Sequence, residues 1–377
     1  MSARILICRS NPLAPDPRVE KIARALLGAG YTVHLLGWDR SASLPARALE
    51  NGLQIERLPI RAEFGRGLAN LPNLLRWQWG LWGWLRRNRR AYDVIHACDF
   101  DTILPALLAK RLWGKRVVYD IFDFYADHLR ATPRPLVRAI RRADLGAIDR
   151  ADALILADDS RREQIRGSAP RRCTVVYNSP EDLRAGLEAP PEAGDTGLRL
   201  CYVGLLQVER GIFELLQVLE RRPTWRLDLA GFGGDEALIR ERIAAMPNVT
   251  WHGRIPYRQA LQLSLAADAL FATYDPAIPN HRYASPNKVF EAMMLGKPVI
   301  VARDTHMDRL ITAANCGLVV PYGEVQALEA ALARLEADPG LRRSLGENAR
   351  RVYESTYSWA EMEKRVLGLY RELLADG

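Results

Sequence analysis

The sequence predicts an α/β protein with two doubly wound parallel sheets, each in its own domain. Short apolar runs alternate with segments of helical spacing along the chain, which is the pattern of successive β-α-β units. The chain has 377 residues, of which 48% are hydrophobic, and this is too long for one ordinary core. Residues 181–197, rich in proline and glycine, have the composition of a linker. We therefore expect two Rossmann-like domains that face each other across a cleft, the usual ligand site of such folds.

The first predicted domain spans residues 1–180. A strand-like run at residues 4–9 is followed by helical spacing at residues 19–30 and by a second strand at residues 31–38. This β-α-β unit implies a parallel sheet with right-handed crossovers. Further strands are predicted at residues 53–59, 94–97, 116–120, 153–157 and 174–177.

The second predicted domain spans residues 198–355 and begins with a strand at residues 198–203 and a helix at residues 212–221. The tail is helical in pattern, with Ser358 as a cap, and we expect residues 356–377 to pack back on the first domain. Further strands are predicted at residues 226–230, 249–252, 269–272, 298–301 and 317–320, and helices at residues 236–245, 257–266, 286–295 and 325–337.

Composition limits the compartment and the partners. The five cysteines lie far apart without a C-x-x-C, which argues against a disulfide framework and a structural zinc. The chain has no signal peptide and no apolar run long enough to span a membrane, so we expect a cytoplasmic protein. The net charge is +8, with arginines clustered in the first half, which suggests an anionic partner. The loop after the first strand lacks G-x-G-x-x-G, which argues against a dehydrogenase.

The most informative segment is SPNKVFEAMMLGKPVIV at residues 285–301. Pro286 suits the first turn of a helix with Ser285 as its cap, and the free amides at such an end can bind a diphosphate. Glu291 follows at about 9 Å along the helix axis, an offset that suits a carboxylate on ribose hydroxyls. An ordinary amphipathic helix with an exposed glutamate explains the same spacing, so both interpretations stay open.

A glycine-rich turn at residues 202–212, YVGLLQVERGI, supports the first interpretation. Gly204 ends a strand, and Arg210 stands directly before a second glycine, where its guanidinium could bind two phosphate oxygens at once. By itself this is a weak signal, because every Rossmann turn contains glycine.

Together these segments resemble the nucleotide-sugar site of the retaining GT-B glycosyltransferases of family 4, the glycosyl transferases group 1. The family pattern is a glutamate, seven residues, and a second glutamate that opens E-A-M-x-x-G-x-P-V. Glu291 matches the second glutamate, Tyr283 stands at the first, and the segment is similar to the subset of relatives with S-P-N-K-x-x-E. The matches cover nearly the whole chain in order. The resemblance implies a GT-B fold with the nucleotide sugar bound in the C-terminal half.

The resemblance also implies residue roles. Arg210 and Lys288 would contact the diphosphate and Glu291 the ribose. Residues 229–233 resemble the turn that flanks the base and the phosphates, and residues 249–255 resemble the strand whose following residues pack near the base. The implied nucleotide-sugar-binding residues are Gly204, Arg210, Gly231, Arg254, Ser285, Asn287, Lys288 and Glu291.

The predicted acceptor side departs from the family. Residues 118–125, VYDIFDFY, occupy the position where many relatives have Tyr-Asp-x-His-Glu, so Phe122 replaces the family histidine. Asp120 and Asp123 remain as candidate catalytic residues, and either could orient a sugar hydroxyl or the acceptor. Capping of the following turn explains Asp120 as well.

The resemblance implies transfer of a sugar from a nucleoside diphosphate to a hydroxyl of a glycan or lipid-linked acceptor, with retention, in cell-surface polysaccharide or glycolipid synthesis. The leaving diphosphate would itself help to deprotonate the acceptor, so no metal or cofactor is expected. Asp99 and Asp101 form a D-x-D, which holds a metal only in a different glycosyltransferase fold. Two alternatives stay open: a non-catalytic partner subunit, favoured by Phe122 and Tyr283, and another GT-B enzyme such as a nucleotide-sugar epimerase.

Residues 68–90 combine four tryptophans, several leucines and four terminal arginines. An interfacial helix on anionic lipid has this composition, which would place the protein at the inner face of the cell membrane beside a lipid-linked acceptor. A helix whose aromatics pack on the sheet explains it equally well. No recognised nucleic-acid-binding motif accompanies the arginines, so nucleic acid is not an expected partner.

Overall fold

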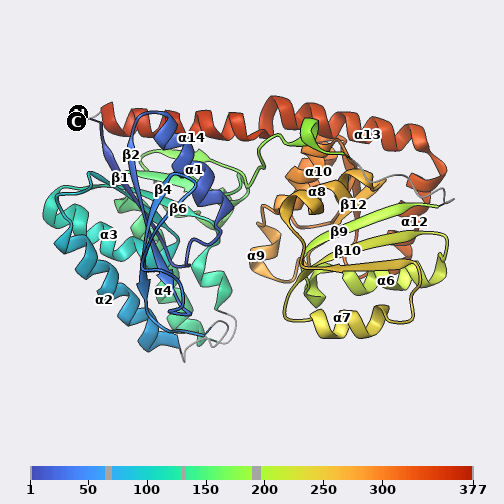
Figure 1. The fold of residues 1–377 in the computed structure, drawn as a ribbon, viewed down its shortest axis with the longest axis horizontal. Coiled ribbons are helices and arrows are strands. Elements are labelled where there is room, and N and C mark those ends of the chain that lie inside the picture. The colour runs from blue at the N-terminus through green and yellow to red at the C-terminus, as the bar shows by residue number, and fades with distance from the viewer. Residues whose placement is uncertain (1, 64–69, 130–131, 189–196, 376–377) are drawn as a thin grey trace. The chain divides into compact units, whose positions relative to one another are not determined.

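The computed structural model describes residues 2–63, 70–129, 132–188 and 197–375. These residues form two compact units (Figure 1). The first unit comprises Met1–Tyr177 and Met362–Gly377, and the second comprises Asn178–Glu361. Part of the predicted linker, residues 189–196, lies outside the described residues.

The first unit contains an eight-stranded sheet in the order β3-β4-β2-β1-β5-β6-β7-β8. All neighbouring pairs are parallel except β3 and β4, which form an antiparallel hairpin. The turn of this hairpin is Asn51-Gly52, with positive φ at both residues, as the Asn-Gly turn of a tight hairpin requires. The strands are β1 (Arg4–Arg9), β2 (Thr32–Asp39), β3 (Arg47–Glu50), β4 (Leu53–Pro59), β5 (Val94–Cys98), β6 (Arg116–Ile121), β7 (Ala153–Leu156) and β8 (Cys173–Val175).

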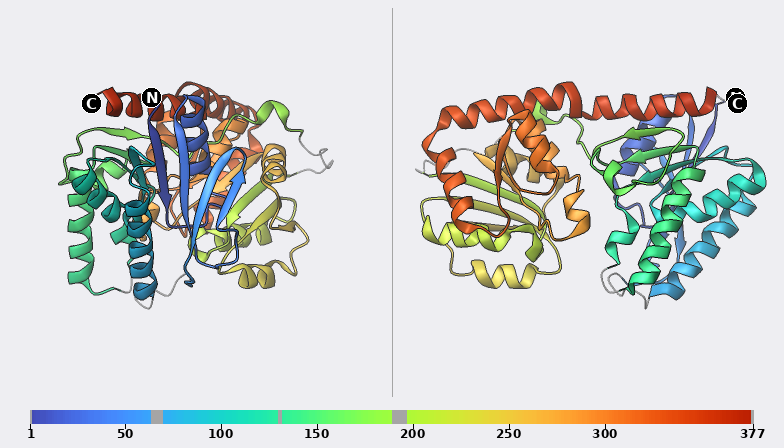
Figure 2. Two further views of the ribbon diagram at one scale, coloured as in Figure 1. Left: turned by 60° about the vertical axis from the view of Figure 1, so that its left-hand side comes forward. Right: turned by 180° about the vertical axis from the view of Figure 1, so that it is seen from behind.

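Helices cover both faces of this sheet (Figures 1 and 2). Buried residues of α2, α3 and α4 join one apolar cluster with Leu6 and Cys8 of β1. Successive strand residues point to opposite faces of a sheet, so His96 of β5 points away from the cluster that contains Ile95 and Ala97. On this other face, His96 contacts Tyr370 of α14. The helices of this unit are α1 (Pro17–Gly28), α2 (Leu71–Arg87), α3 (Phe100–Trp113), α4 (Arg134–Arg150) and α5 (Arg161–Gln164), and α14 (Trp359–Ala375) enters it at Met362.

The second unit contains a six-stranded parallel sheet in the order β11-β10-β9-β12-β13-β14. Two doubly wound sheets with helices confirm the predicted α/β class. The strands are β9 (Arg199–Leu205), β10 (Arg226–Phe232), β11 (Val249–Gly253), β12 (Ala269–Ala272), β13 (Val299–Ala302) and β14 (Gly317–Val320). The helices are α6 (Ile212–Arg221), α7 (Glu236–Ile243), α8 (Tyr257–Ala266), α9 (Pro279–Arg282), α10 (Asn287–Leu295), α11 (Met307–Ala314), α12 (Val325–Ala337) and α13 (Pro339–Val352).

The helical tail differs from one continuous helix. A π-helical turn at Tyr353–Tyr357 separates α13 from α14. Ser358 follows the turn, and its hydroxyl accepts a hydrogen bond from the Glu361 amide at 3.4 Å, which agrees with the predicted cap. No helix within the described ranges has the length and apolarity needed to span a membrane.

Candidate functional site

In each sheet, the next strand of the chain lies on one side of the first strand and a later strand lies on the other side. The position where the strand order reverses in this way is the topological switch point of the sheet. In the second unit the switch point lies between β9 and β12. The loops after these two strands are joined directly: the Thr273 hydroxyl donates to the Arg210 carbonyl at 3.0 Å, and the Asp275 amide donates to the Glu209 carbonyl at 3.0 Å. Ligands of open α/β sheets bind at such points, outside the carboxyl ends of the strands.

Two cations meet at this switch point. The Arg210 guanidinium carbon lies 4.1 Å from the centroid of the Tyr274 ring. The Lys288 ammonium nitrogen, from the first turn of α10, lies 3.5 Å from the Tyr202 centroid and 5.9 Å from the Tyr274 centroid. Within the described part of the chain, neither cation has a carboxylate at ion-pair distance.

The pKa of Lys288 reflects this environment. Burial of the ammonium group and the neighbouring Arg210 charge lower the pKa well below its usual value, while Glu291 acts in the opposite direction. The half-buried Glu291 side chain also forms a hydrogen bond with Tyr257 at the start of α8. The structure therefore brings together Arg210, Lys288 and Glu291, the three residues that the sequence assigns to diphosphate and ribose.

Two glycines give the strands room at this site. Gly204 and Gly231 are paired in the register of β9 and β10. A Cβ atom on Gly231 would stand 1.9 Å from the Gly204 carbonyl oxygen, and a Cβ on Gly204 would stand 3.2 Å from the Lys288 ammonium nitrogen. Side chains at these positions would displace the strand pair or the lysine.

The start of α10 differs from the prediction. The helix begins at Asn287, with Pro286 rather than Ser285 as its N-cap, because the Pro286 carbonyl accepts the first helical hydrogen bond, from Val289, at 3.1 Å. The Ser285 carbonyl instead accepts from the Asn178 side chain at 3.0 Å. The Ser285 hydroxyl is buried and has no hydrogen-bond partner among the described residues. Asn287 is exposed at the first helical position.

Arg254 lies at the end of a different strand. Its guanidinium carbon is 4.7 Å from the centroid of Phe232, and both residues are exposed. Phe232 ends β10, beside Gly231, so the pair borders the same edge of the sheet as Gly204. An exposed aromatic ring stacked with arginine is a surface on which a planar base could stack.

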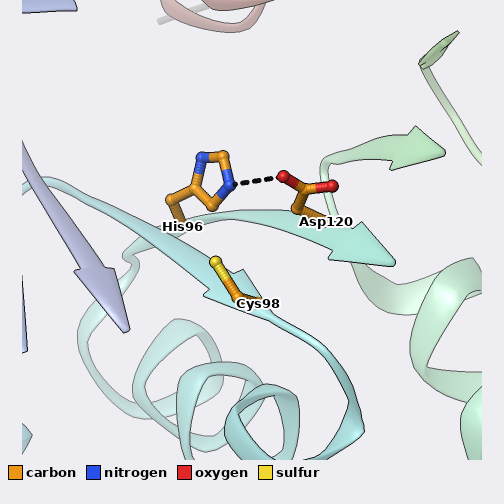
Figure 3. Close-up of side chains that lie close together, drawn as sticks. All are labelled: His96, Cys98 and Asp120. Atoms are coloured by element: carbon orange, nitrogen blue, oxygen red, sulfur yellow. Dashed lines mark hydrogen bonds and ion pairs between the residues drawn. The ribbon is translucent and has the colours of Figure 1, made fainter. Parts of the chain in front are cut away.

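In the first unit, Asp120 is fully buried on β6, the strand beside β5. Its carboxylate pairs with the Arg18 guanidinium at 2.8 Å and contacts the His96 Nε2 at 3.3 Å (Figure 3). The His96 Nδ1 lies 2.8 Å from the Tyr370 hydroxyl of α14. Burial raises the pKa of Asp120, but Arg18 and His96 outweigh burial, and the pKa lies below its usual value. Direct contact between Asp120 and a substrate would require this network to open.

Asp123, the other candidate catalytic residue, is accessible. Its carboxylate lies 2.7 Å from the Arg161 guanidinium, and 46% of the side chain is exposed. The preceding amide, that of Phe122, donates to the Asp99 carboxylate at 2.8 Å. Sequence reasoning missed this role of Asp99, although its position directly after β5 is a signal for it.

The closest arrangement to a metal site in the described ranges is His96, Cys98 and Asp120, whose ligand atoms lie within 4.8 Å of one another (Figure 3). Arg18 already pairs with the carboxylate, and Tyr370 with the imidazole. Burial raises the pKa of the Cys98 thiol well above its usual value, so the thiolate that a metal requires is disfavoured. The donor set fits a buried hydrogen-bond network better than a metal.

Comparison with known proteins identifies the family. Residues 188–352 match the family described as Glycosyl transferases group 1, and residues 14–179 match the Glycosyl transferase 4-like domain. A D-inositol 3-phosphate glycosyltransferase from Saccharomonospora viridis is 30% identical over 312 residues, which cover 75% of this chain and 71% of that protein. The chain belongs to the glycosyl transferases group 1 family.

Relatives of lower sequence identity and solved structures are also glycosyltransferases or share the fold of this chain. A glycogen synthase from Mycobacterium tuberculosis is 22% identical over 290 residues, covering 74% of this chain and 68% of the relative. The structure of sucrose-phosphate synthase from Thermosynechococcus elongatus has a TM-score of 0.78 at 18% identity and covers 100% of both chains. HepE from Anabaena, in complex with UDP and glucose, has a TM-score of 0.70 at 18% identity and covers 98% of this chain and 99% of HepE. The protein is thus a glycosyltransferase with the GT-B fold.

This group 1 glycosyltransferase has aromatic rings at both positions where the sequence departs from the family pattern. Tyr283 stacks on His306, with ring centroids 4.9 Å apart and an interplanar angle of 20°. Two guanidinium groups contact the Phe122 ring, those of Arg9 at 4.0 Å and Arg18 at 4.8 Å from its centroid. Each replacement therefore has aromatic or cationic neighbours of its own.

The tryptophan-rich segment of this glycosyltransferase has two faces. Its first two residues, 68 and 69, lie outside the described residues, and α2 covers the central part. Trp77 and Trp84 are buried in the apolar cluster, as packing on the sheet predicts. Trp79, in contrast, is 73% exposed and shares a stripe of four-residue spacing with the exposed Leu71 and Leu75. Packing on the sheet is thus confirmed for one face of the helix, while the lipid-interface interpretation of the exposed face stays a prediction.

Proposed function

We propose that this group 1 glycosyltransferase is a retaining hexosyltransferase of family 4. It transfers a sugar from a nucleoside diphosphate to a hydroxyl of a glycan or lipid-linked acceptor, in cell-surface polysaccharide or glycolipid synthesis. The observation that carries the proposal is the convergence of Arg210 and Lys288 on Tyr274, at the switch point and next to Glu291.

Electrostatics favour a diphosphate at this point. Two neighbouring cations repel each other, and this repulsion contributes to the lowered pKa of Lys288. A diphosphate would supply the negative charge that Glu291 alone does not provide to the two cations. Glu291 can then accept hydrogen bonds from ribose hydroxyls once Tyr257 releases it.

The solved neighbours suggest the first ligands to test. HepE was crystallised with UDP and with UDP-glucose, and we take a uridine diphosphate sugar as the first candidate substrate. The exposed Phe232 and Arg254 would stack with the base. The other predicted contacts, Ser285 and Asn287, lie at the start of α10, where helix amides favour phosphate.

For the acceptor side we propose different roles for the two aspartates. Asp123 is accessible and would orient an acceptor hydroxyl. Asp120 would act through Arg18, which it holds beside Phe122. Transfer then depends on positioning and on charge stabilisation of the leaving diphosphate, without a nucleophilic residue.

We also propose a peripheral membrane contact through the exposed stripe of α2. Leu71, Leu75 and Trp79 would enter the interface, with the arginines that end the helix near anionic lipid headgroups. Such a contact would hold the protein at the inner face of the membrane, near a lipid-linked acceptor. Co-sedimentation with vesicles that contain phosphatidylglycerol tests this, and Trp79→Ser should reduce the bound fraction while the exposed-surface control Leu238→Ser should not.

The decisive experiment is a thermal-shift and calorimetric screen of the full chain against UDP, GDP, ADP, TDP and their sugar conjugates. A ligand that binds only the folded state raises the melting temperature. One preferred nucleotide, together with sugar transfer or slow hydrolysis of its conjugate, supports the proposal. Absence of binding to all of these ligands would refute it.

A second candidate function is a non-catalytic partner subunit. The aromatic replacements Phe122 and Tyr283, each packed against its own neighbours, favour it. Undetectable binding of every nucleotide in the screen would favour this alternative, and under it the protein would neither transfer nor hydrolyse the sugar. Reverting Phe122→His and Tyr283→Glu would then leave the rate at zero, whereas an active enzyme would show a measurable change.

A further inference from the structure

The turn that carries Arg210 is fixed by residues from two other loops of the second unit. It is a 3₁₀ turn at Val208–Arg210, directly before α6. Each carbonyl oxygen of the turn accepts a hydrogen bond from a residue far along the chain. The donors are the Tyr322 hydroxyl to Val208 at 3.3 Å, the Asp275 amide to Glu209 at 3.0 Å and the Thr273 hydroxyl to Arg210 at 3.0 Å. The protein itself therefore fixes the backbone from which the Arg210 side chain extends.

The Arg210 guanidinium group is held on two sides. Its central carbon lies 4.1 Å from the centroid of the Tyr274 ring, and this cation–π contact keeps the group over the ring. Along its edge, the Nε and Nη2 groups both donate to the Gln207 Oε1, each at 3.3 Å. Donors on neighbouring nitrogens that share one acceptor fix the direction in which the group points. Tyr274 and Gln207 thus determine the position and the direction of the guanidinium group.

The contact with Gln207 decides which N–H groups of Arg210 remain for a ligand. A guanidinium group has five N–H donors, and Gln207 takes two of them, on the Nε–Nη2 edge. The other three, two on Nη1 and one on Nη2, have no hydrogen-bond partner in the part of the chain that the structure describes. The parallel N–H groups of Nη1 and Nη2 form the end of the side chain. This end has the geometry that binds two oxygens of a phosphate group.

The acceptor that directs Arg210 carries no charge. A carboxylate at position 207 could accept the same two hydrogen bonds, but its negative charge would offset the charge of the guanidinium group. The amide oxygen of Gln207 orients the group and leaves its charge in place. In agreement, the Arg210 charge still acts on Lys288, whose pKa it helps to lower. Gln207 therefore combines a fixed direction with an undiminished positive charge at the switch point.

We propose that Gln207 is a positioning residue for the nucleotide sugar: it directs the end of the Arg210 guanidinium group toward the diphosphate without neutralising it. This inference rests on the proposed function, because it takes the diphosphate as the ligand of Arg210. A side chain that is already oriented loses little freedom when the ligand binds, and this favours affinity. Because Gln207 acts through Arg210, its contribution should disappear when Arg210 is removed.

Calorimetry of the full chain with UDP, GDP, ADP and TDP tests both parts of this role, and thermal melting checks that each variant is folded. Gln207→Leu removes the acceptor and should raise the Kd of the preferred diphosphate about tenfold. Gln207→Glu keeps the size and the acceptor but adds a negative charge, and it should raise Kd about 100-fold. A residue that only fills space would show the opposite order, because glutamate resembles glutamine in shape and leucine does not. Gln217→Glu makes the same change on the exposed face of α6 and should leave Kd unchanged.

The variant Arg210→Ala completes the test. In this background, Gln207→Leu should change Kd by less than about twofold, because no guanidinium group is left to direct. A loss that persists in full without Arg210 would overturn the proposal, and so would Kd values for Gln207→Leu and Gln207→Glu that equal that of the parent chain. Both outcomes leave the proposed function intact, because the parent chain still binds the diphosphate. Absence of binding of all these ligands to the parent chain would refute the proposed function itself, and the role of Gln207 with it.

Discussion

At the scale of single residues, the charge on Lys288 is unfavourable for the free protein but favourable for binding an anion. Its ammonium group is close to another cation, and burial together with Arg210 lowers its pKa well below the usual value. An arrangement of like charges is unfavourable in the free protein and becomes favourable when an anion arrives. Glu291 is the balancing group nearby, and its side chain also forms a hydrogen bond with Tyr257.

Glu291→Ala should weaken binding of UDP, or of whichever nucleoside diphosphate binds best, by about 10- to 100-fold. A carboxylate that accepts ribose hydroxyls contributes about 1.5–3 kcal/mol, and each 1.4 kcal/mol is tenfold in Kd. Isothermal titration calorimetry measures the loss, and thermal melting checks that the fold is retained. As a control, Glu347→Ala removes an exposed glutamate of α13 and should leave Kd unchanged. Equal Kd values for Glu291→Ala and the parent chain would remove this residue from the site.

Nucleotide binding should also depend on pH through Lys288. A bound diphosphate favours the protonated lysine, so the pKa of Lys288 should be higher in the complex than in the free protein. The affinity should therefore fall as pH rises through the free-protein pKa, and binding in that range should take up a proton. Calorimetry in two buffers of different ionisation enthalpy measures the uptake. In Lys288→Met the affinity should be lower and the proton uptake absent; uptake that persists in this variant would assign it to another group.

At the scale of elements, most strands and several helices follow from the sequence, since apolar periodicity and glycine or proline boundaries are local signals. The strands at Arg4–Arg9 and Ala269–Ala272 and the helix at Ile212–Arg221 have the predicted limits. The hairpin strand Arg47–Glu50 was missed, although Asn51-Gly52 is a hairpin signal, because its alternation is short and polar. The start of α10 shifted by one residue, since either Ser285 or Pro286 can precede a helix.

Packing of α4 on the sheet introduces a carboxyl group that titrates near neutrality. Asp144 is fully buried and accepts a hydrogen bond from the Tyr119 hydroxyl of β6 at 2.7 Å. Burial raises its pKa to about 7, although the bond to Tyr119 acts in the opposite direction. The folded state therefore binds the proton of the Asp144 carboxyl group more tightly than the unfolded chain does. Protonation of Asp144 stabilises the folded state at acidic pH, and this stabilisation is lost as the pH rises towards 7.

Asp144→Asn should accordingly stabilise the first unit at alkaline pH and have little effect at acidic pH. The asparagine amide oxygen can still accept the hydrogen bond from the Tyr119 hydroxyl. The substitution at the same time removes the buried negative charge. The gain is on the order of 1–3 kcal/mol, because one pKa unit corresponds to about 1.4 kcal/mol. Urea unfolding at both pH values, followed by tryptophan fluorescence, measures the difference. The exposed Asp149→Asn serves as the control, and a gain of equal size at acidic pH would contradict the titration argument.

At the scale of the whole molecule, the sequence predicts the fold class and the proximity of Arg210, Lys288 and Glu291, but only part of the first unit's interior. Residues 285–291 lie close together in the chain, so their spacing on one helix is readable. The network of Arg18, His96, Asp120 and Tyr370 joins residues far apart in sequence, and no local pattern indicates it. Phe122 was visible as a departure, while its two guanidinium neighbours come from β1 and α1.

The division into units leads to the last prediction. Every predicted nucleotide-sugar-binding residue lies within Asn178–Glu361, which is one continuous segment, whereas the first unit needs both Met1–Tyr177 and Met362–Gly377. A fragment of residues 178–361 should therefore fold by itself and bind UDP within about threefold of the full chain, a difference below 1 kcal/mol. Circular dichroism establishes folding, and calorimetry gives Kd. A chain that ends at residue 361 should lose stability in the first unit, because Val366, Tyr370 and Leu373 no longer cover its sheet. If the fragment is folded but does not bind the nucleotide that the full chain binds, the first unit supplies part of the nucleotide site, and Arg210, Lys288 and Glu291 are insufficient without it.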